Sequence, residues 1–214
     1  MYSIRVFLVL IFTAAIISLS AFTSFTVDYS QPGYDQHKLS FDLGDFDLRA
    51  VRVNGTLYTQ LVFDHSIFTR DKGYAQLPYL NATIAIPDDR NVELSIIPVG
   101  YEEFQLNEPL LPSRGVIYRN QDPDLIPYEI DPASLQDEWY PGNLATITEP
   151  FIIRDIRGVS IYTYPFQYNA ARNILRVYSS IDIYLQENDE VPVNPLLKKD
   201  NSIQREMDGI YRSV

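Results

Sequence analysis

The chain has 214 residues, and 46% of them are hydrophobic. This length and composition suffice for one domain with a well-packed core, but the chain is too short for two domains with linkers. Its 16 Tyr, 11 Phe and 14 Pro predict strands and turns rather than helices, because aromatic side chains suit a pleated sheet. A net charge of -11 argues against nucleic acid as a partner, since phosphates require clustered Lys and Arg. The chain contains no Cys, which excludes disulfides and a cysteine nucleophile within it.

The first twenty residues have the organisation of a secretory signal peptide. Arg5 precedes the apolar run 6–17, and Ser18 and Ser20 form a small-x-small cleavage pattern. An uncleaved membrane anchor is the alternative, but this run is short of the roughly 20 apolar residues that a spanning helix needs. We therefore expect export to the periplasm, the cell surface or the medium, with no stable membrane span after cleavage. Residues 21–38 are expected to form an irregular leader.

Alternating apolar and polar residues predict one β-sandwich over residues 39–187. The dipeptide Asn54-Gly55 favours a type I′ hairpin turn, whereas Pro98 and Gly100 are expected to end a strand. The expected strands cover residues 39–43, 50–53, 56–63, 80–86, 92–99, 101–106, 151–164 and 174–185. This spacing is typical of an all-β fold, a two-sheet β-sandwich resembling a jelly roll. At most one or two short helical turns are expected, one of them after Asp131, and residues 188–214 are expected to be a linker or tail.

The sequence contains no recognisable catalytic or metal-binding set. The two histidines, His37 and His65, lack a Ser and acidic partner at a known spacing. The paired carboxylates at 88–89 and 122–124 lack the spacing of a calcium loop, and we expect no cofactor or metal. Charges at Arg154, Asp155 and Arg157 fall inside a strand pattern, where cross-strand ion pairs are the expected role.

Residues 109–128 predict a long displayed loop. Pro109, Pro112, Pro123 and Pro127 interrupt ladder hydrogen bonding, and Gly115 permits a turn. The loop also carries Arg114 and Arg119 in an otherwise acidic chain. From composition alone, an ordinary surface loop with solvated cations is the simpler interpretation.

The same loop opens an ordered set of motifs at 111–119, 122–128, 139–142, 145–158, 165–169 and 175–178. In order and spacing, this set resembles the N-terminal pro-region of the gingipain family of secreted cysteine endopeptidases. Weaker similarity covers residues 73–78 and 210–213. The resemblance implies a non-catalytic β-sandwich prodomain that acts as an intramolecular inhibitor and folding assistant of a peptidase domain. In the family, the catalytic domain with its Cys and His would follow this region, whereas the sequence ends at Val214. Three interpretations therefore remain open: an excised prodomain, a truncated or split gene product, and a free inhibitor.

The resemblance also implies that a basic residue of the loop occupies the specificity pocket of the peptidase. By motif position this residue is Arg119, with Arg114 as the competitor. A guanidinium pairs bidentately with a pocket carboxylate, so an arginine-preferring peptidase is the expected partner. The expected supporting residues of the loop are Pro112, Arg114, Gly115, Tyr118, Pro123 and Pro127. The alternative is a secreted adhesion or carbohydrate-binding module, which would need exposed, coplanar aromatic side chains.

Overall fold

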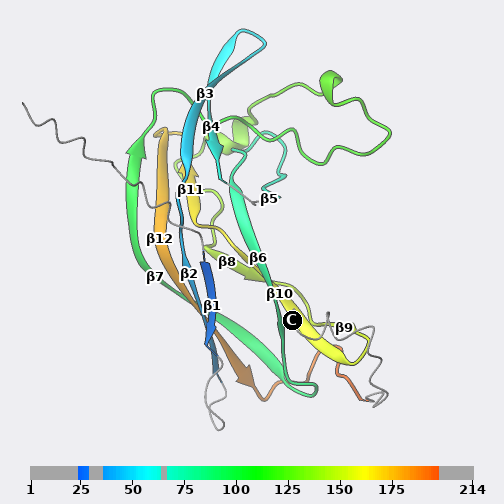
Figure 1. The fold of residues 1–214 in the computed structure, drawn as a ribbon. Helices are drawn as coiled ribbons and strands as arrows, with labels where there is room; N and C mark the ends of the chain where they lie inside the picture. Colours follow the sequence, from blue (N-terminus) through cyan, green and yellow to red (C-terminus); the bar gives the residue numbers. More distant parts are fainter. Residues whose placement is uncertain (1–23, 29–35, 64–66, 198–214) are drawn as a thin grey trace, which may run out of the picture.

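The computed structural model describes residues 24–28, 36–63 and 67–197, which form two five-stranded antiparallel sheets and a two-stranded hairpin. The first sheet contains β1 (Ser24–Asp28), β2 (Gln36–Asp42), β7 (Asn91–Gln105), β11 (Phe166–Asn169) and β12 (Ile174–Asn188). The second contains β5 (Ile67–Phe68), β6 (Pro78–Ala85), β8 (Ala145–Ile147), β9 (Phe151–Ile153) and β10 (Ile156–Thr163). Figure 1 shows the two sheets as facing layers. The predicted all-β sandwich is therefore confirmed.

Two apolar clusters fill the space between the layers. The first cluster contains Ile181, Ile183 and Leu185, which alternate along β12 and are fully buried. These side chains pack with Ile84 of β6 and Ile161 of β10. The second cluster contains Leu61, Leu77, Leu110, Phe166 and Leu175. Because the side chains of a strand alternate between its faces, each buried row follows from the period of two in the sequence.

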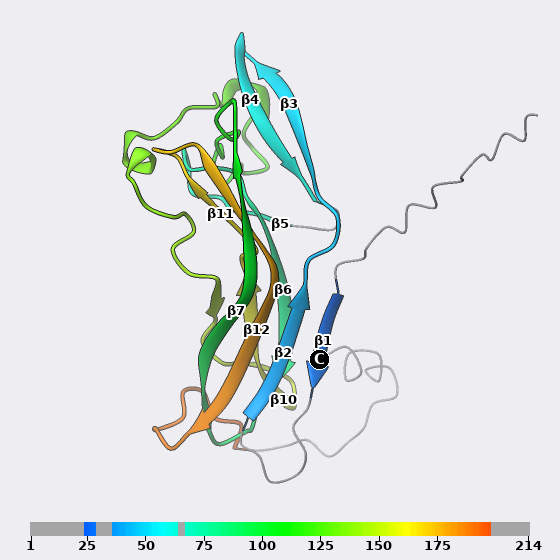
Figure 2. The same cartoon turned by 90° about the vertical axis from the view of Figure 1, so that its left-hand side faces the viewer.

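The hairpin β3 (Asp47–Val53) and β4 (Thr56–Val62) turns at Asn54 and Gly55. Both residues have positive φ, 49° and 85°, which a type I′ turn requires, so the predicted turn is confirmed. Figure 2 shows that this hairpin extends beyond the ends of the two sheets. The expected helical turn after Asp131 is the 3-10 turn η2 (Pro132–Leu135), and a second one, η1 (Pro123–Leu125), lies within the loop.

Several boundaries differ from the prediction. The leader, expected to be irregular, contains β1 and the start of β2. These strands extend the first sheet, because β2 pairs with β12 and β1 pairs with β2. β7 continues through Pro98 and Gly100 because it pairs only with β12 and is an edge strand, where a missing N–H faces no neighbour. Register shifts opposite Ser180 accommodate the interruption.

The predicted strand 151–164 is instead a hairpin. Arg154 has φ 60°, and the chain reverses so that Ile153 of β9 faces Ile156 of β10. The expected cross-strand ion pairing of Arg157 is wrong as well, since the residue is 1% exposed and its guanidinium donates mainly to backbone carbonyls. The acceptors are the carbonyls of Pro87, Arg90, Val193 and Asn194.

These bonds dock part of the expected linker onto the sandwich. Asn91 accepts from the amide of Val193, and the amide of Leu196 donates to the carbonyl of Asp88. Residues 189–197 thus lie beside the β6–β7 connection, at the end of the sandwich opposite the loop (Figure 1). The predicted signal peptide lies outside the described residues, and among those that are described no helix is long and apolar enough to cross a membrane.

Candidate functional site

The base of loop 109–128 is not displayed but forms part of the sandwich. On one side, Thr59 of β4 donates to the carbonyl of Pro109 and accepts from the amide of Leu111, both at 2.8 Å. On the other side, Ser113 donates to the carbonyl of Tyr74 at 2.7 Å. The intervening Pro112 is buried and forms an isolated bridge with Ala75. Backbone pairing on both sides therefore fixes where the loop leaves the fold.

Segment 71–74, which receives this base, is itself held by Tyr140. The phenol of Tyr140 donates to Asp71 at 2.7 Å, and its ring lies 4.8 Å from that of Tyr74, centroid to centroid. Burial raises the pKa of Tyr140, so the phenol stays protonated and remains a donor across the physiological range. The loop therefore starts from a neutral, hydrogen-bonded aromatic support.

Gly73 adds a backbone contact that only glycine permits. Its φ is +83°, and a Cβ at this position would lie 2.6 Å from both the amide nitrogen and the Cβ of Asp131. Asp131 caps η2 and donates its amide to the carbonyl of Gly73 at 3.1 Å. The base of the loop and the segment that returns from it are thus joined at one point.

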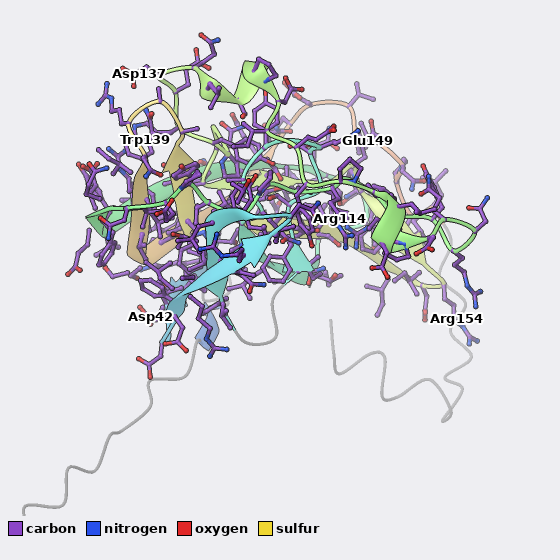
Figure 3. All side chains as sticks on the ribbon, turned by 90° about the horizontal axis from the view of Figure 1, so that it is seen from above. Asp42, Arg114, Asp137, Trp139, Glu149 and Arg154 are labelled. Atoms are coloured by element: carbon purple, nitrogen blue, oxygen red, sulfur yellow. The ribbon has the colours of Figure 1, made fainter. Side chains whose placement is uncertain are left out.

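Arg114 braces the loop from within. Its Nη1 donates to the carbonyl of Pro123, and its guanidinium lies 4.5 Å from the ring centroid of Tyr128. The amide of Gly115 donates to the hydroxyl of Ser113 at 3.1 Å, and the φ of Gly115 is +81°. In Figure 3, Arg114 lies near the middle of the molecule as seen from above. Nη1 of Arg114 is thus already engaged within the loop.

A pocket of about 360 Å³ lies under the braced part of the loop. Arg114, Gly115, Ile117 and Tyr128 line it from the loop, and residues 67–70 line it from the sandwich. Arg114 covers one face of Tyr128, and the pocket separates this part of the loop from residues 67–70.

The tip of the loop is a closed turn that presents Arg119. The amide of Gln121 donates to the carbonyl of Tyr118, and the amide of Tyr118 donates to Oε1 of Gln121, both at 2.9 Å. Arg119 is exposed, and within the part of the chain that the structure describes its guanidinium makes no hydrogen bond or ion pair. Tyr118 is 64% exposed beside it. The tip therefore combines a fixed backbone with a free cation.

The returning side of the loop is stiffened by prolines. Pro123 opens η1, which Asp122 caps by accepting from the amide of Asp124 at 3.0 Å. Pro127 is exposed two residues after η1. Sequence reasoning named both prolines and both arginines but missed Gln121. Asn120 is a usable turn signal, yet a glutamine that bonds the amide three residues before it has no sequence signature.

The described residues contain no group of three or more His, Asp or Glu side chains that could hold a metal ion. Three charged groups of the loop and of the segment after it, Asp122, Asp131 and Arg114, serve capping and bracing. The chemistry that this loop can perform is recognition: the exposed guanidinium of Arg119 can form an ion pair with a carboxylate or another anionic group.

A sequence model of the family described as Propeptide_C25 matches residues 34–206. Gingipain R2 of Porphyromonas gingivalis strain W83 is 29% identical over 177 residues, which are 83% of this chain and 24% of that protein. Gingipain R1 of Porphyromonas gingivalis is 31% identical over 162 residues, which are 76% of this chain and 16% of that protein. The chain thus spans a quarter or less of the length of these curated relatives.

Two solved structures share the fold. A chain from the complex of Porphyromonas gingivalis RgpB pro- and mature domains matches with a TM-score of 0.77 and 27% identity, covering 89% of this chain and 95% of that one. A structure described as an insight into the zymogenic latency of gingipain K from the same organism matches with a TM-score of 0.66 and 19% identity, covering 81% and 96%. The chain belongs to the Propeptide_C25 family and is a non-catalytic pro-region of the gingipain type.

Proposed function

We propose that this pro-region keeps a gingipain-like cysteine peptidase domain latent by placing Arg119 in its specificity pocket, and that it assists the folding of that domain. The observation that carries the proposal is an exposed guanidinium, without a hydrogen-bond or ion-pair partner among the described residues, at the tip of a loop that is braced on both sides. We further propose that segment 1–20 directs export of the chain and that residues 198–214 lead toward the peptidase domain.

The bracing matters because a preordered loop loses little conformational entropy when it binds. The base is paired with Thr59 and Tyr74, Arg114 closes the middle, and Gln121 closes the tip. Arg119 therefore reaches a pocket with only its own side chain left to order.

The chemistry of Arg119 supports an arginine-preferring partner. A guanidinium presents donors in a planar fork that matches a carboxylate bidentately, which an ammonium does not reproduce. A pocket with a carboxylate at its bottom would therefore bind Arg119 as it binds a substrate arginine. The net charge of -11 is compatible with a basic docking face on the peptidase.

Two aromatic groups of the described chain have a geometry that does not suit the platform of a carbohydrate-binding module. The guanidinium of Arg176 lies 3.8 Å from the ring centroid of Trp139 and 4.4 Å from that of Tyr101, so it covers both rings. Tyr79 and Tyr162 meet edge to face, at an interplanar angle of 86°. Coplanar stacking on a sugar is not available at either place, and the inhibitor is the function that the geometry supports.

The proposal is tested by adding the purified chain to an arginine-specific peptidase of the gingipain type and measuring the inhibition constant with a small arginine substrate. Removing one partner of a desolvated charge pair costs about 2–5 kcal/mol, so Arg119→Ala should weaken inhibition about 100-fold. Arg119→Lys should recover only part of this loss.

Arg90→Ala is the matched control, because Arg90 is an exposed, ion-paired arginine in the β6–β7 connection, at the other end of the sandwich (Figure 1). It should inhibit as the unaltered chain does. Arg114→Ala removes only a brace and should weaken inhibition less than Arg119→Ala does. A chain whose inhibition is unchanged by Arg119→Ala would overturn the proposal, and a larger loss with Arg114→Ala would assign the pocket to Arg114.

A further inference from the structure

The turn at the loop tip is closed by a side chain as well as by the backbone. Gln121 accepts from the amide of Tyr118 through Oε1 and donates its own amide to the carbonyl of Tyr118, both at 2.9 Å. Arg119 and Asn120 lie inside the resulting ring. Both backbone polar groups of Tyr118, the residue before the arginine, are thus already used within the loop.

This closure conflicts with the backbone shape that hydrolysis requires. Extended peptides bind by main-chain hydrogen bonds along a strand edge of the partner. A four-residue turn holds its end Cα atoms within about 7 Å, whereas four extended residues span about 10 Å. To be cut as a substrate, the Arg119–Asn120 bond must therefore leave the turn, and the bond between Tyr118 and Gln121 must open.

We propose that Gln121 is a positioning residue that lets Arg119 fill an arginine pocket while the Arg119–Asn120 bond resists hydrolysis. This inference rests on the proposed function, which it deepens. Hydrolysis of that bond would add one water and leave a carboxylate on Arg119 and an amine on Asn120. Gln121 opposes this reaction by holding the carbonyl of Arg119 in a turn, away from the alignment that attack needs.

The brace at Arg114 supports the same role. It links residue 114 to the carbonyl of Pro123, so the segment that contains the turn is closed at its base as well as at its tip. The two ends that a cut would create are therefore held near each other. This arrangement favours a slow cut and retention of the loop over release.

The test incubates the full chain with the arginine-specific peptidase and follows, by mass spectrometry, the fragment that ends at Arg119. Removing one hydrogen bond of ordinary strength from the resting turn should speed this cleavage about fivefold in Gln121→Ala. Gln121→Glu keeps an acceptor oxygen at the same reach and should be cut at the rate of the unaltered chain. Gln136→Ala, at an exposed glutamine that follows η2, is the matched control and should also leave the rate unchanged.

A thermal melt of each variant separates positioning from general stability. The turn is exposed, so Gln121→Ala should melt with the unaltered chain while its cleavage rate rises. Equal cleavage rates for Gln121→Ala and the unaltered chain, with inhibition still dependent on Arg119, would overturn this inference alone. Inhibition that does not depend on Arg119 would overturn the proposed function and this inference with it.

Discussion

Replacing Arg157 with methionine removes the group that ties two segments, the β6–β7 connection and residues 193–194, to β10 at the end of the sandwich opposite the loop. Its guanidinium donates to the carbonyls of Arg90 and Val193 at 2.6 and 2.7 Å, and its Nε donates to the carbonyl of Asn194 at 3.0 Å. A fourth bond reaches the carbonyl of Pro87. Methionine has about the length of the apolar stem of arginine and keeps its packing, so the substitution mainly removes the donors.

The expected destabilisation is about 3–5 kcal/mol. Hydrogen bonds to a charged group contribute about 1.5–3 kcal/mol each, but bonds that share one donor group are not additive. The carbonyls left behind can regain water only if residues 189–197 detach. For a domain of this size, about 2–4 °C of melting temperature corresponds to 1 kcal/mol, which predicts a loss of roughly 6–20 °C.

Urea unfolding and calorimetry measure this change, and proteolysis within 189–197 reports whether that segment detaches. Arg90→Ala is the control, because it removes an exposed ion pair with Asp189 and keeps the backbone carbonyl that Arg157 uses. Exposed pairs contribute about 0–1 kcal/mol. A loss in Arg157→Met no larger than in Arg90→Ala would refute the view that this arginine holds the segment in place.

Two further predictions concern other parts of the sandwich. Gly73→Ala should destabilise the domain by about 2–4 kcal/mol in urea, because the new Cβ would lie 2.6 Å from Asp131. Gly55→Ala, with similar φ and nothing within 4 Å, should cost only about 1–2 kcal/mol, and equal losses would contradict the close contact. A hydrogen bond from Lys38, and to a lesser extent one from Ser40, lowers the pKa of Asp182 in the folded chain. The ionised carboxylate therefore stabilises the fold fully above the unfolded pKa of about 3.9. This stabilisation is lost as the pH falls through the folded pKa of Asp182. The stability deficit of Asp182→Asn relative to the unaltered chain should therefore be largest at pH 7 and should shrink as the pH falls below about 3.9, and a deficit that does not shrink in acid would argue against the linkage.

The parts of the fold that the sequence predicted well are those set by local rules. Alternation in residues 80–86 placed Ile84 and Ile86 on the buried face, because a strand has a period of two. Asn54 and Gly55 identified their turn because few residues accept positive φ at two successive positions. Such features need no knowledge of the rest of the chain.

The parts that the sequence did not predict depend on distant partners. Arg154 occupies a positive φ that usually belongs to Gly or Asn, so the hairpin between β9 and β10 had no local signal. Pro98 is tolerated because β7 lies at a sheet edge, which only the strand order reveals. Arg157 was expected to form a cross-strand ion pair because its actual acceptors, in the β6–β7 connection and at residues 193–194, are far away in the chain.

The arginines of this domain carry the same charge but differ in whether their N–H donors are already hydrogen-bonded within the protein. Arg157 directs all of its nitrogen atoms to the protein, and Arg176 is stacked between two rings and bonded to Glu103. Arg114 is bonded to the backbone of its own loop. A guanidinium so engaged would have to break these bonds before it could pair with a carboxylate on a partner. Composition could not separate Arg114 from Arg119. The donors of Arg119, which have no partner among the residues that the structure describes, lie at the tip of a closed turn and support our proposal that Arg119 is the arginine offered to the peptidase.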